Sequence, residues 1–229
     1  MIDFFMGMAT ALRGAVAYGR GMQLLNGMFI TIQLSMGAIL VGLVLGSIIV
    51  AFKMSRFKIL NFISFVYLGA VRGTPAVTQI MLIAAIFFAG FRGNRVWIGI
   101  LALGINSGAY VAEIIRAGIM SIDKGQTEAG LSLGLNKVQT MSFVVMPQAV
   151  KNILPTFVNE FIVLIKETAI VGFVAIQDLT RVAQQILART ADFTPLLVAA
   201  AMYLILISSL TFLLGLLEKR LRASDRAQR

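Results

Sequence analysis

Cysteine and histidine are both absent from the 229 residues of this sequence. Without cysteine the chain cannot form a disulfide framework or a thiolate metal site. Without histidine it lacks the commonest general base and metal ligand, which excludes a serine-hydrolase triad and a zinc-protease motif. The glycine-rich loop G-x-x-x-x-G-K-[ST] is missing too, so the chain does not bind ATP through that motif. These absences argue against an enzyme.

Charge is also scarce. Only 13% of the residues are charged, whereas soluble domains carry roughly 25%, and 59% are hydrophobic. A membrane-spanning helix needs about 20 mostly apolar residues. Four runs of about that length contain no charged residue at all: 21–52, 73–91, 96–112 and 193–217. A soluble protein could hide such runs as buried core helices, but this chain is too short to bury four. The sequence predicts an all-α integral membrane helical bundle.

The hydrophobic pattern predicts about five transmembrane helices in a single domain. The expected spans are 25–52, 75–91, 96–120, 152–176 and 193–217. The apolar stretch 59–71 is too short to cross a bilayer and reads as an elbow into the second span. Residues 1–21 have no leading positive charge, so we expect an interfacial lead-in rather than a cleaved signal peptide. Residues 218–229 are expected to form a charged tail.

The distribution of lysine and arginine predicts the orientation. Twelve of these residues flank one side of the predicted spans and six flank the other. The side with more positive charge should be cytoplasmic, with the N-terminus outside and the C-terminus inside. The formal net charge of +10 therefore reflects lysine and arginine side chains near lipid headgroups at the cytoplasmic surface, rather than a binding site for nucleic acid.

The segment 120–150 interrupts the apolar pattern on the predicted cytoplasmic side. Asp123 is a candidate N-cap, with Gln126 as its partner in a capping box. Asn136 could end the helix in a left-handed conformation, and Pro147 marks a later break. Helical spacing after Asp123 places four residues on one face: Leu131, Gly134, Leu135 and Val138. Gly134 has no side chain on that face, so it would permit close approach or a bend. We expect one short surface helix over 123–137, and amphipathicity alone leaves open whether it faces lipid or a protein.

Glu128-Ala129-Gly130, followed by Gly134 and Pro147, resembles the EAA loop of ABC importer permeases. More of the chain, over about 26–221, is similar to the polar amino acid branch of that family. The matching stretches keep the family's order: NG…TIQLS from Asn26, RGTP from Arg72, NSGAYVAEIIRAG from Asn106, KGQ from Lys124, MPQA from Met146, and NEF…KET from Asn159. One residue departs from the pattern. Gly130 stands where the family commonly has alanine, which lowers helix propensity by up to about 1 kcal/mol.

The resemblance implies the type I ABC importer permease fold, a bacterial inner-membrane location and a set of partners. These are a second permease, identical or related, two ATPase subunits that bind ATP and magnesium, and an extracytoplasmic substrate-binding protein. The EAA loop would form a coupling helix that docks on an ATPase. Mapped by motif, the coupling residues are Lys124, Gly125, Glu128, Ala129, Gly130, Leu131 and Gly134. The chain itself would hold no cofactor.

Glu160, Lys166 and Glu167 all fall within the fourth predicted span. An ionised group at the centre of a membrane helix costs about 2.5–3.5 kcal/mol on insertion scales, so these three must be paired, near the surface or facing a wet cavity. Other predicted spans supply further charges that could lock helices together. The candidate structural charge pairs are Arg72, Glu113, Arg116, Lys166 and Glu167.

An amino acid substrate needs hydrogen-bond donors for its carboxylate and acceptors for its ammonium group. Glu160 would be the partner of the ammonium group or of a basic side chain, which favours basic or neutral substrates over acidic ones. Broken backbone beside Thr74 could offer free amides, as in other discontinuous transporter helices. The candidate substrate-binding residues are Thr74, Asn106, Ser107, Tyr110, Asn159, Glu160 and Thr168; hydrogen bonds that pack helices are the alternative role.

A second functional hypothesis is an ATP-independent carrier or channel for small polar solutes. Such a protein has no need of an EAA segment, which favours the importer permease. The sequence leaves open the amino acid transported and whether the two permeases of the complex are identical.

Overall fold

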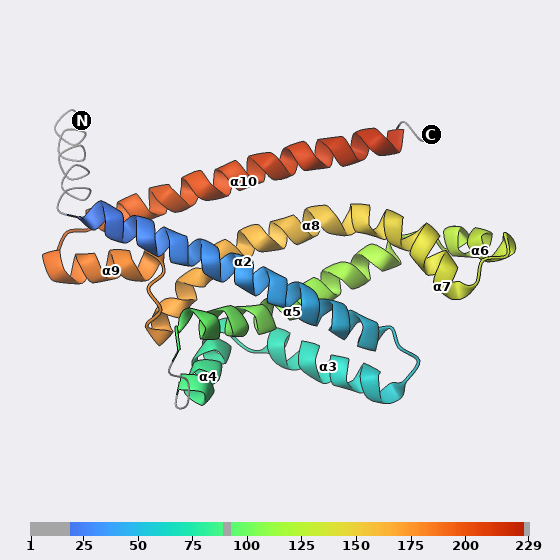
Figure 1. Cartoon of the computed structure of the whole chain (residues 1–229), viewed down its shortest axis with the longest axis horizontal. Helices are drawn as coiled ribbons and strands as arrows, with labels where there is room; N and C mark the ends of the chain where they lie inside the picture. The colour runs from blue at the N-terminus through green and yellow to red at the C-terminus, as the bar shows by residue number, and fades with distance from the viewer. Residues whose placement is uncertain (1–18, 89–92, 227–229) are drawn as a thin grey trace.

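The computed structural model describes residues 19–88 and 93–226, and all regular secondary structure in these ranges is helical (Figure 1). Most of the predicted lead-in 1–21 therefore lies outside the described residues. The elements are α2 (Arg20–Lys53), α3 (Lys58–Gly73), α4 (Ala76–Phe88), α5 (Val96–Met120), α6 (Lys124–Ser132), α7 (Lys137–Thr140), the π-helix η1 (Met141–Val145), α8 (Met146–Glu167), the 3-10 helix η2 (Thr168–Val174), α9 (Leu179–Thr190) and α10 (Thr194–Arg226).

Three helices among the described residues are long and apolar enough to cross a membrane: α2, α5 and α10. The pair α3 and α4 passes the same test together but is bent by 110°. The remaining predicted span corresponds to α8, which carries the charges of Lys151, Glu160, Lys166 and Glu167. The all-helical membrane fold is thus found, and the count of five spans stays a prediction because α8 is not among the helices that are long and apolar enough to cross a membrane.

Helices α2 and α5 form the centre of the bundle, and glycines bring their backbones together. A Cβ atom at Gly46 would lie 2.9 Å from both the Gly108 carbonyl oxygen and the Ala112 nitrogen. A Cβ at Gly104 would lie 2.6 Å from the side chain of Val41. Apolar association gains nothing in lipid tails, so close packing of small residues is what holds membrane helices together. The uncharged runs of α2 and α5 therefore meet along their glycines.

The elements divide between two ends of the molecule (Figure 1). The α2–α3 connection, α6, α7 and the C-terminal end of α10 lie toward one end. The first turn of α2, the start of α5 and α9 lie toward the other. This is the separation that the lysine and arginine distribution predicts. Helix α10 also continues past the predicted end at residue 217, to Arg226.

The stretch 59–71, predicted as an elbow, is instead the body of helix α3, and the chain bends after it, at Thr74 and Pro75. Thr74 has an extended backbone, with φ −125° and ψ 151°, as expected for a residue that precedes a proline. The Gln79 side chain spans the bend and donates to the carbonyl oxygens of Val71 (2.6 Å) and Thr74 (3.0 Å). The bend thus exposes carbonyls that Gln79 satisfies, which the sequence analysis did not anticipate.

The single helix predicted over 123–137 is instead two helices. Helix α6 ends at Ser132, and Gly134 adopts a left-handed backbone at φ +85° while the Leu135 amide donates to the Gly130 carbonyl. Glycine adopts this conformation without steric cost, so Gly134 rather than Asn136 terminates the helix. A bend at Gly134 is therefore present, but no close approach, because a Cβ there would meet nothing within 4 Å. The face predicted from Leu131 to Val138 is broken at this turn.

The capping interactions also differ from the prediction. Asp123 is the N-cap of α6, but its side chain accepts from the Gly125 amide and forms no capping box with Gln126. The capping box lies at α7, where the side chains and backbone amides of Asn136 and Gln139 bond reciprocally at 2.9 Å. Asn136 thus starts a helix instead of ending one, because Gly134 has already reversed the chain.

The fourth predicted span begins earlier than expected. Helices α7, η1 and α8 run on from one another, so Pro147 stands in the first turn of α8 and does not break the helical path. Proline is tolerated there because a first-turn amide needs no partner in its own α-helix. Helical structure then continues through η2 to Val174, close to the predicted end at 176.

Candidate functional site

A polar pocket lies between α5 and α8. Its volume is about 590 Å³, and it is lined by Tyr110, Glu113, Ile114, Ala117, Gly118, Ser121, Asn152, Thr156, Asn159 and Glu160. Every one of these residues belongs to α5 or α8, apart from Ser121 at the end of α5. Asn152 donates a hydrogen bond to Ser121 (2.9 Å), which ties the two helices together at one edge of the pocket.

Three of the seven predicted substrate-binding residues line this pocket: Tyr110, Asn159 and Glu160. Ser107 is connected to them, since its hydroxyl donates to Glu160 Oε1 at 3.2 Å. Glu160 takes part in no ion pair in the described part of the chain. Its carboxylate lines the pocket, where it accepts the hydrogen bond from Ser107. Of the charges in α8, this one is placed to meet a solute.

The other three predicted residues lie elsewhere. Asn106 donates to Gln79 Oε1 (3.0 Å), and the same amide group of Gln79 donates to Thr74 Oγ1 (2.8 Å). Asn106 and Thr74 therefore belong to a network that fastens the bend of α3 and α4 onto α5. Thr168 is fully buried and donates to the Ile165 carbonyl (2.7 Å), away from the pocket. These contacts match the helix-packing alternative.

Residues that the sequence analysis missed include Asn152, Thr156 and Gln79. Asn152, Thr156 and Asn159 recur at i, i+4 and i+7, which places them on one face of α8 together with Glu160. A search for polar residues at helical spacing within the fourth span would have found this stripe. No comparable pattern marks Gln79, because Thr78 beside it is the other polar residue of α4 and the two form no stripe at helical spacing.

A cluster of four charges lies beside the pocket and joins three helices. Glu113 of α5 contacts Arg116 through two bonds of 2.8 Å, from Nε and Nη2. It also lies 3.6 Å from Arg72 of α3 and 3.6 Å from Lys53 of α2. The structure thus brings together the predicted Arg72, Glu113 and Arg116 and adds Lys53, which the sequence analysis had counted only as a flanking charge.

Lys166 and Glu167 behave differently from that cluster. Within the described residues neither takes part in an ion pair shorter than 4 Å, although both were predicted as structural charges. Lys166 is exposed and Glu167 is half-buried at the end of α8. Both groups stand at the end of α8, where the helix changes to η2.

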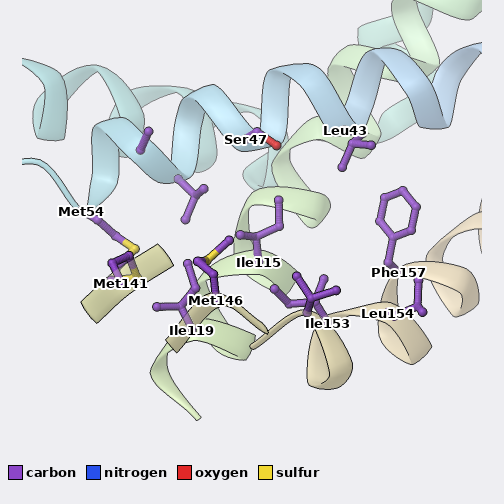
Figure 2. A pocket seen from close by; sticks show the side chains of 13 residues that line it. Leu43, Ser47, Met54, Ile115, Ile119, Met141, Met146, Ile153, Leu154 and Phe157 are labelled. Atoms are coloured by element: carbon purple, nitrogen blue, oxygen red, sulfur yellow. The ribbon is translucent and has the colours of Figure 1, made fainter. Parts of the chain in front are cut away.

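A second cavity, of about 640 Å³, is almost wholly apolar (Figure 2). Side chains from α2, α5, η1 and α8 point into it, among them Met54, Met141 and Met146. Gly118 lines the polar pocket while Ile153 lines the apolar cavity, and these two residues touch where α5 crosses α8. The polar and the apolar spaces therefore lie on opposite sides of one helix crossing.

The segment formed by α6, the turn at Gly134 and α7 is exposed on its outer surface. Lys124, Gly125, Glu128 and Ala129 are exposed, and so are the apolar side chains of Leu131, Leu133 and Val138. Gly130 alone is buried in α6. A Cβ atom there would lie 2.7 Å from Thr140 Cγ2, so glycine at this position lets α6 pack directly on α7. This contact accounts for the departure from the alanine that the EAA pattern commonly has.

Comparison with known proteins now identifies the family. Residues 38–223 match the family described as "Binding-protein-dependent transport system inner membrane component". The chain belongs to this family. Among its relatives is the arginine transport system permease protein ArtQ of Bacillus subtilis (strain 168), 39% identical over 88% of this chain and 94% of that protein. The glutamine transport system permease protein GlnP of Escherichia coli (strain K12) is 35% identical over 87% of this chain and 93% of that protein.

Solved structures agree with this assignment. A chain in the crystal structure of an amino acid ABC transporter with histidines is 41% identical and superposes with a TM-score of 0.81, covering 86% of this chain and 94% of that one. A chain of the inward-facing MetNI methionine ABC transporter has the same fold, with a TM-score of 0.75 at 16% identity over 90% of this chain and 99% of that one. The chain is thus a non-catalytic, multi-pass inner-membrane permease of a binding-protein-dependent ABC transporter, and the resemblance seen in the sequence is confirmed.

Proposed function

We propose that this permease passes basic or neutral polar amino acids across the inner membrane and meets them in the α5–α8 pocket. Glu160 is the observation that carries the proposal, because it lines the pocket beside a hydroxyl and takes part in no ion pair among residues 19–88 and 93–226. A desolvated carboxylate is stabilised by an ammonium or guanidinium group and repels another carboxylate. The names of relatives that transport arginine or glutamine fit this preference.

The rest of the pocket suits the other end of an amino acid. The amides of Asn152 and Asn159 and the hydroxyls of Tyr110 and Thr156 offer hydrogen-bond donors for a carboxylate. Glu113 also lines the pocket, but Arg116, Arg72 and Lys53 already surround it. We assign Glu113 to holding α2, α3 and α5 together and Glu160 to substrate.

We further propose that α6 and α7 form the coupling surface for the ATPase subunit. Glu128 is exposed, takes part in no ion pair in the described ranges, and stands beside the exposed Leu131. Because α7, η1 and α8 are continuous, a displacement of this surface passes directly into a helix that lines the pocket. The apolar cavity between α2, α5 and α8 leaves room for α8 to move.

The complex that follows contains two permeases, two ATPase subunits and an extracytoplasmic binding protein. The end of the molecule with α6, α7 and the C-terminal part of α10 faces the cytoplasm, and the start of α2 faces outside. The distribution of lysine and arginine supports this orientation. Co-purification identifies the second permease, which is either another copy of this chain or a related protein.

Reconstitution of the complex in liposomes tests the transport proposal. We expect ATP hydrolysis and uptake to rise when arginine or glutamine is added together with the cognate binding protein, and glutamate to give little response. Purified permease alone, in liposomes without ATP, is the control. Uptake by the permease alone would overturn the importer assignment in favour of the ATP-independent carrier, and equal uptake of glutamate would overturn the substrate preference.

A further inference from the structure

The connection between α2 and α3 forms a small pocket that shares no lining residue with the α5–α8 pocket. This α2–α3 basic pocket has a volume of about 340 Å³ and is lined by Ser55, Arg56, Lys58, Asn61, Phe62 and Phe65. Its shape is fixed by local hydrogen bonds. Asn61 donates to the Lys53 carbonyl (3.1 Å), and the Phe57 amide donates to Ser55 Oγ (3.2 Å). The loop is therefore a folded structure with its own site.

The electrostatics of this pocket favour an anion. Arg56 and Lys58 both line it, and no carboxylate does. Neither Arg56 nor Lys58 takes part in the ion pairs around Glu113, and the first turn of α3 contains no acidic residue. The Arg56 guanidinium lies 5.4 Å from the centre of the Phe57 ring. Stacking of this kind leaves the N–H edge of arginine free to bind a phosphate.

The hydrophobic surroundings decide which kind of anion fits. Phe62 and Phe65 are each 66% exposed, and Ile59 beside them is 75% exposed. The 34 residues of α2 span about 50 Å, more than the hydrocarbon thickness of a bilayer, so its end at Lys53 reaches the membrane surface. A ligand here meets basic groups at headgroup level and bare aromatic rings along α3. A phospholipid has both parts, whereas a free phosphate has only the first.

We propose that the α2–α3 basic pocket binds the headgroup phosphate of an anionic phospholipid, whose acyl chains lie along Phe62 and Phe65. Arg56 and Lys58 bind the phosphate, and Ser55 and Asn61 contribute hydroxyl and amide groups. The lipid fills the space between the end of α2 and the start of α3, and so fixes the position of the bent pair α3 and α4 against α2. The proposal does not depend on which solute the protein transports.

Native mass spectrometry of the purified complex, with its ATPase subunits, tests the proposal. Phosphatidylglycerol, phosphatidylcholine and soluble glycerol phosphate are the three probes. We expect the complex to retain phosphatidylglycerol preferentially, and Arg56→Gln/Lys58→Gln to weaken this binding by roughly 10- to 30-fold, since each basic residue near a membrane surface contributes about 1 kcal/mol. Phe62→Ala/Phe65→Ala should lower the affinity for the lipid while leaving that for glycerol phosphate unchanged.

The matched control is Lys219→Gln/Arg220→Gln, which removes two exposed positive charges at the same end of the molecule. This variant should retain the lipid as the unchanged protein does. An equal loss in the control would reduce the effect to overall charge, and equal binding of phosphatidylcholine would remove the role of the anion. If glycerol phosphate competes as well as the lipid, the pocket is a site for free phosphate. If only the permease without its ATPase retains lipid, the loop is an ATPase contact and the proposal is wrong.

Discussion

Ser107 of α5 donates a hydrogen bond of 3.2 Å to Glu160 of α8, across the interface that forms the polar pocket. The two residues are 53 positions apart in the chain. This bond orients the carboxylate toward the pocket and leaves its charge available to a cationic group. Substitutions at these two residues therefore test the proposed substrate preference.

Glu160→Gln should impair uptake of arginine more than uptake of glutamine. The substitution keeps the size of the side chain but removes the charge, and losing one partner of a desolvated charge pair costs about 2 kcal/mol or more, roughly 30-fold in apparent affinity. Initial uptake rates over a range of substrate concentrations give the comparison. Ser107→Ala, which keeps the carboxylate, is the milder control. Unchanged arginine uptake in Glu160→Gln would remove this residue from the site.

Glu113→Gln should lower the stability of the purified protein. The substitution leaves Lys53, Arg72 and Arg116 together without their shared counter-charge. Because these side chains are partly exposed, we expect a loss of about 1 kcal/mol, or a melting temperature about 2–4 °C lower in detergent. Arg72→Gln removes only one contact of 3.6 Å and should have a smaller effect. A Glu113→Gln variant as stable as the unchanged protein would show that the cluster does not hold the helices together.

Glu128→Lys should impair ATP-driven transport without unfolding the permease. Glu128 is exposed on α6 and has no ion-pair partner among the described residues, so its replacement disturbs no internal contact. Reversing the charge should weaken ATPase docking, measured by co-purification of the two subunits. Lys137→Glu reverses a charge on α7, the other half of the proposed surface, and should weaken docking as well. Intact docking and transport in Glu128→Lys would show that the coupling surface lies elsewhere.

Gly130→Ala should destabilise the coupling segment although alanine is the better helix former. The added methyl group would meet Thr140 Cγ2 at 2.7 Å. Overpacking costs about 1–3 kcal/mol, against a gain in helix propensity of about 1 kcal/mol, so the melting temperature should fall. The double variant Gly130→Ala/Thr140→Ser, which lacks the clashing methyl, should recover the loss. A higher melting temperature in Gly130→Ala alone would mean that Thr140 simply rotates away.

The stability contributed by Asp178 should decline as the pH rises from about 4 to 6. Burial raises the pKa of this carboxyl to about 6, although the amides of Arg181 and Thr180 donate to it and oppose the shift. A group whose pKa is raised on folding stabilises the protonated protein, so its contribution is greatest below the unfolded pKa of 3.8 and is lost through pH 6. The melting temperature relative to Asp178→Asn measures this, since Asn cannot titrate. A difference independent of pH would contradict the shift.

The parts of the fold that could be predicted are those with a strong local signal. Helix α5 has the predicted bounds, 96–120, because its apolar pattern begins after the polar turn at Asn94 and Arg95 and ends before the polar residues from Ser121 to Lys124. The elbow before α4 follows from Thr74-Pro75, since proline restricts the residue before it. The helix end near 134 was placed on Asn136 although Gly134 adopts the left-handed backbone. Both residues favour such a turn, and only the chain path selects between them.

The candidate site divides in the same way. Glu160 stood out because a carboxylate within a membrane-spanning segment is costly in free energy, so such residues are rare and mark functional sites. Thr74, Asn106 and Thr168 were equally conspicuous but bond within or between helices instead of lining the pocket. Their side chains are uncharged, so a single hydrogen bond is enough to satisfy them. The sequence offers no measure of which neighbour supplies that bond.

By itself the sequence determined that the chain is a helical membrane permease of an ABC importer. Hydrophobic runs and short motifs are formed by residues that are close together in the chain, so they can be recognised without knowing how the helices pack. The tertiary structure alone decided that Lys53 joins Arg72 and Arg116 around Glu113, that Gln79 fastens the elbow, and that Gly130 rests on Thr140. Helical periodicity says which residues share a face, but not which helix that face meets, because that depends on how the whole bundle packs.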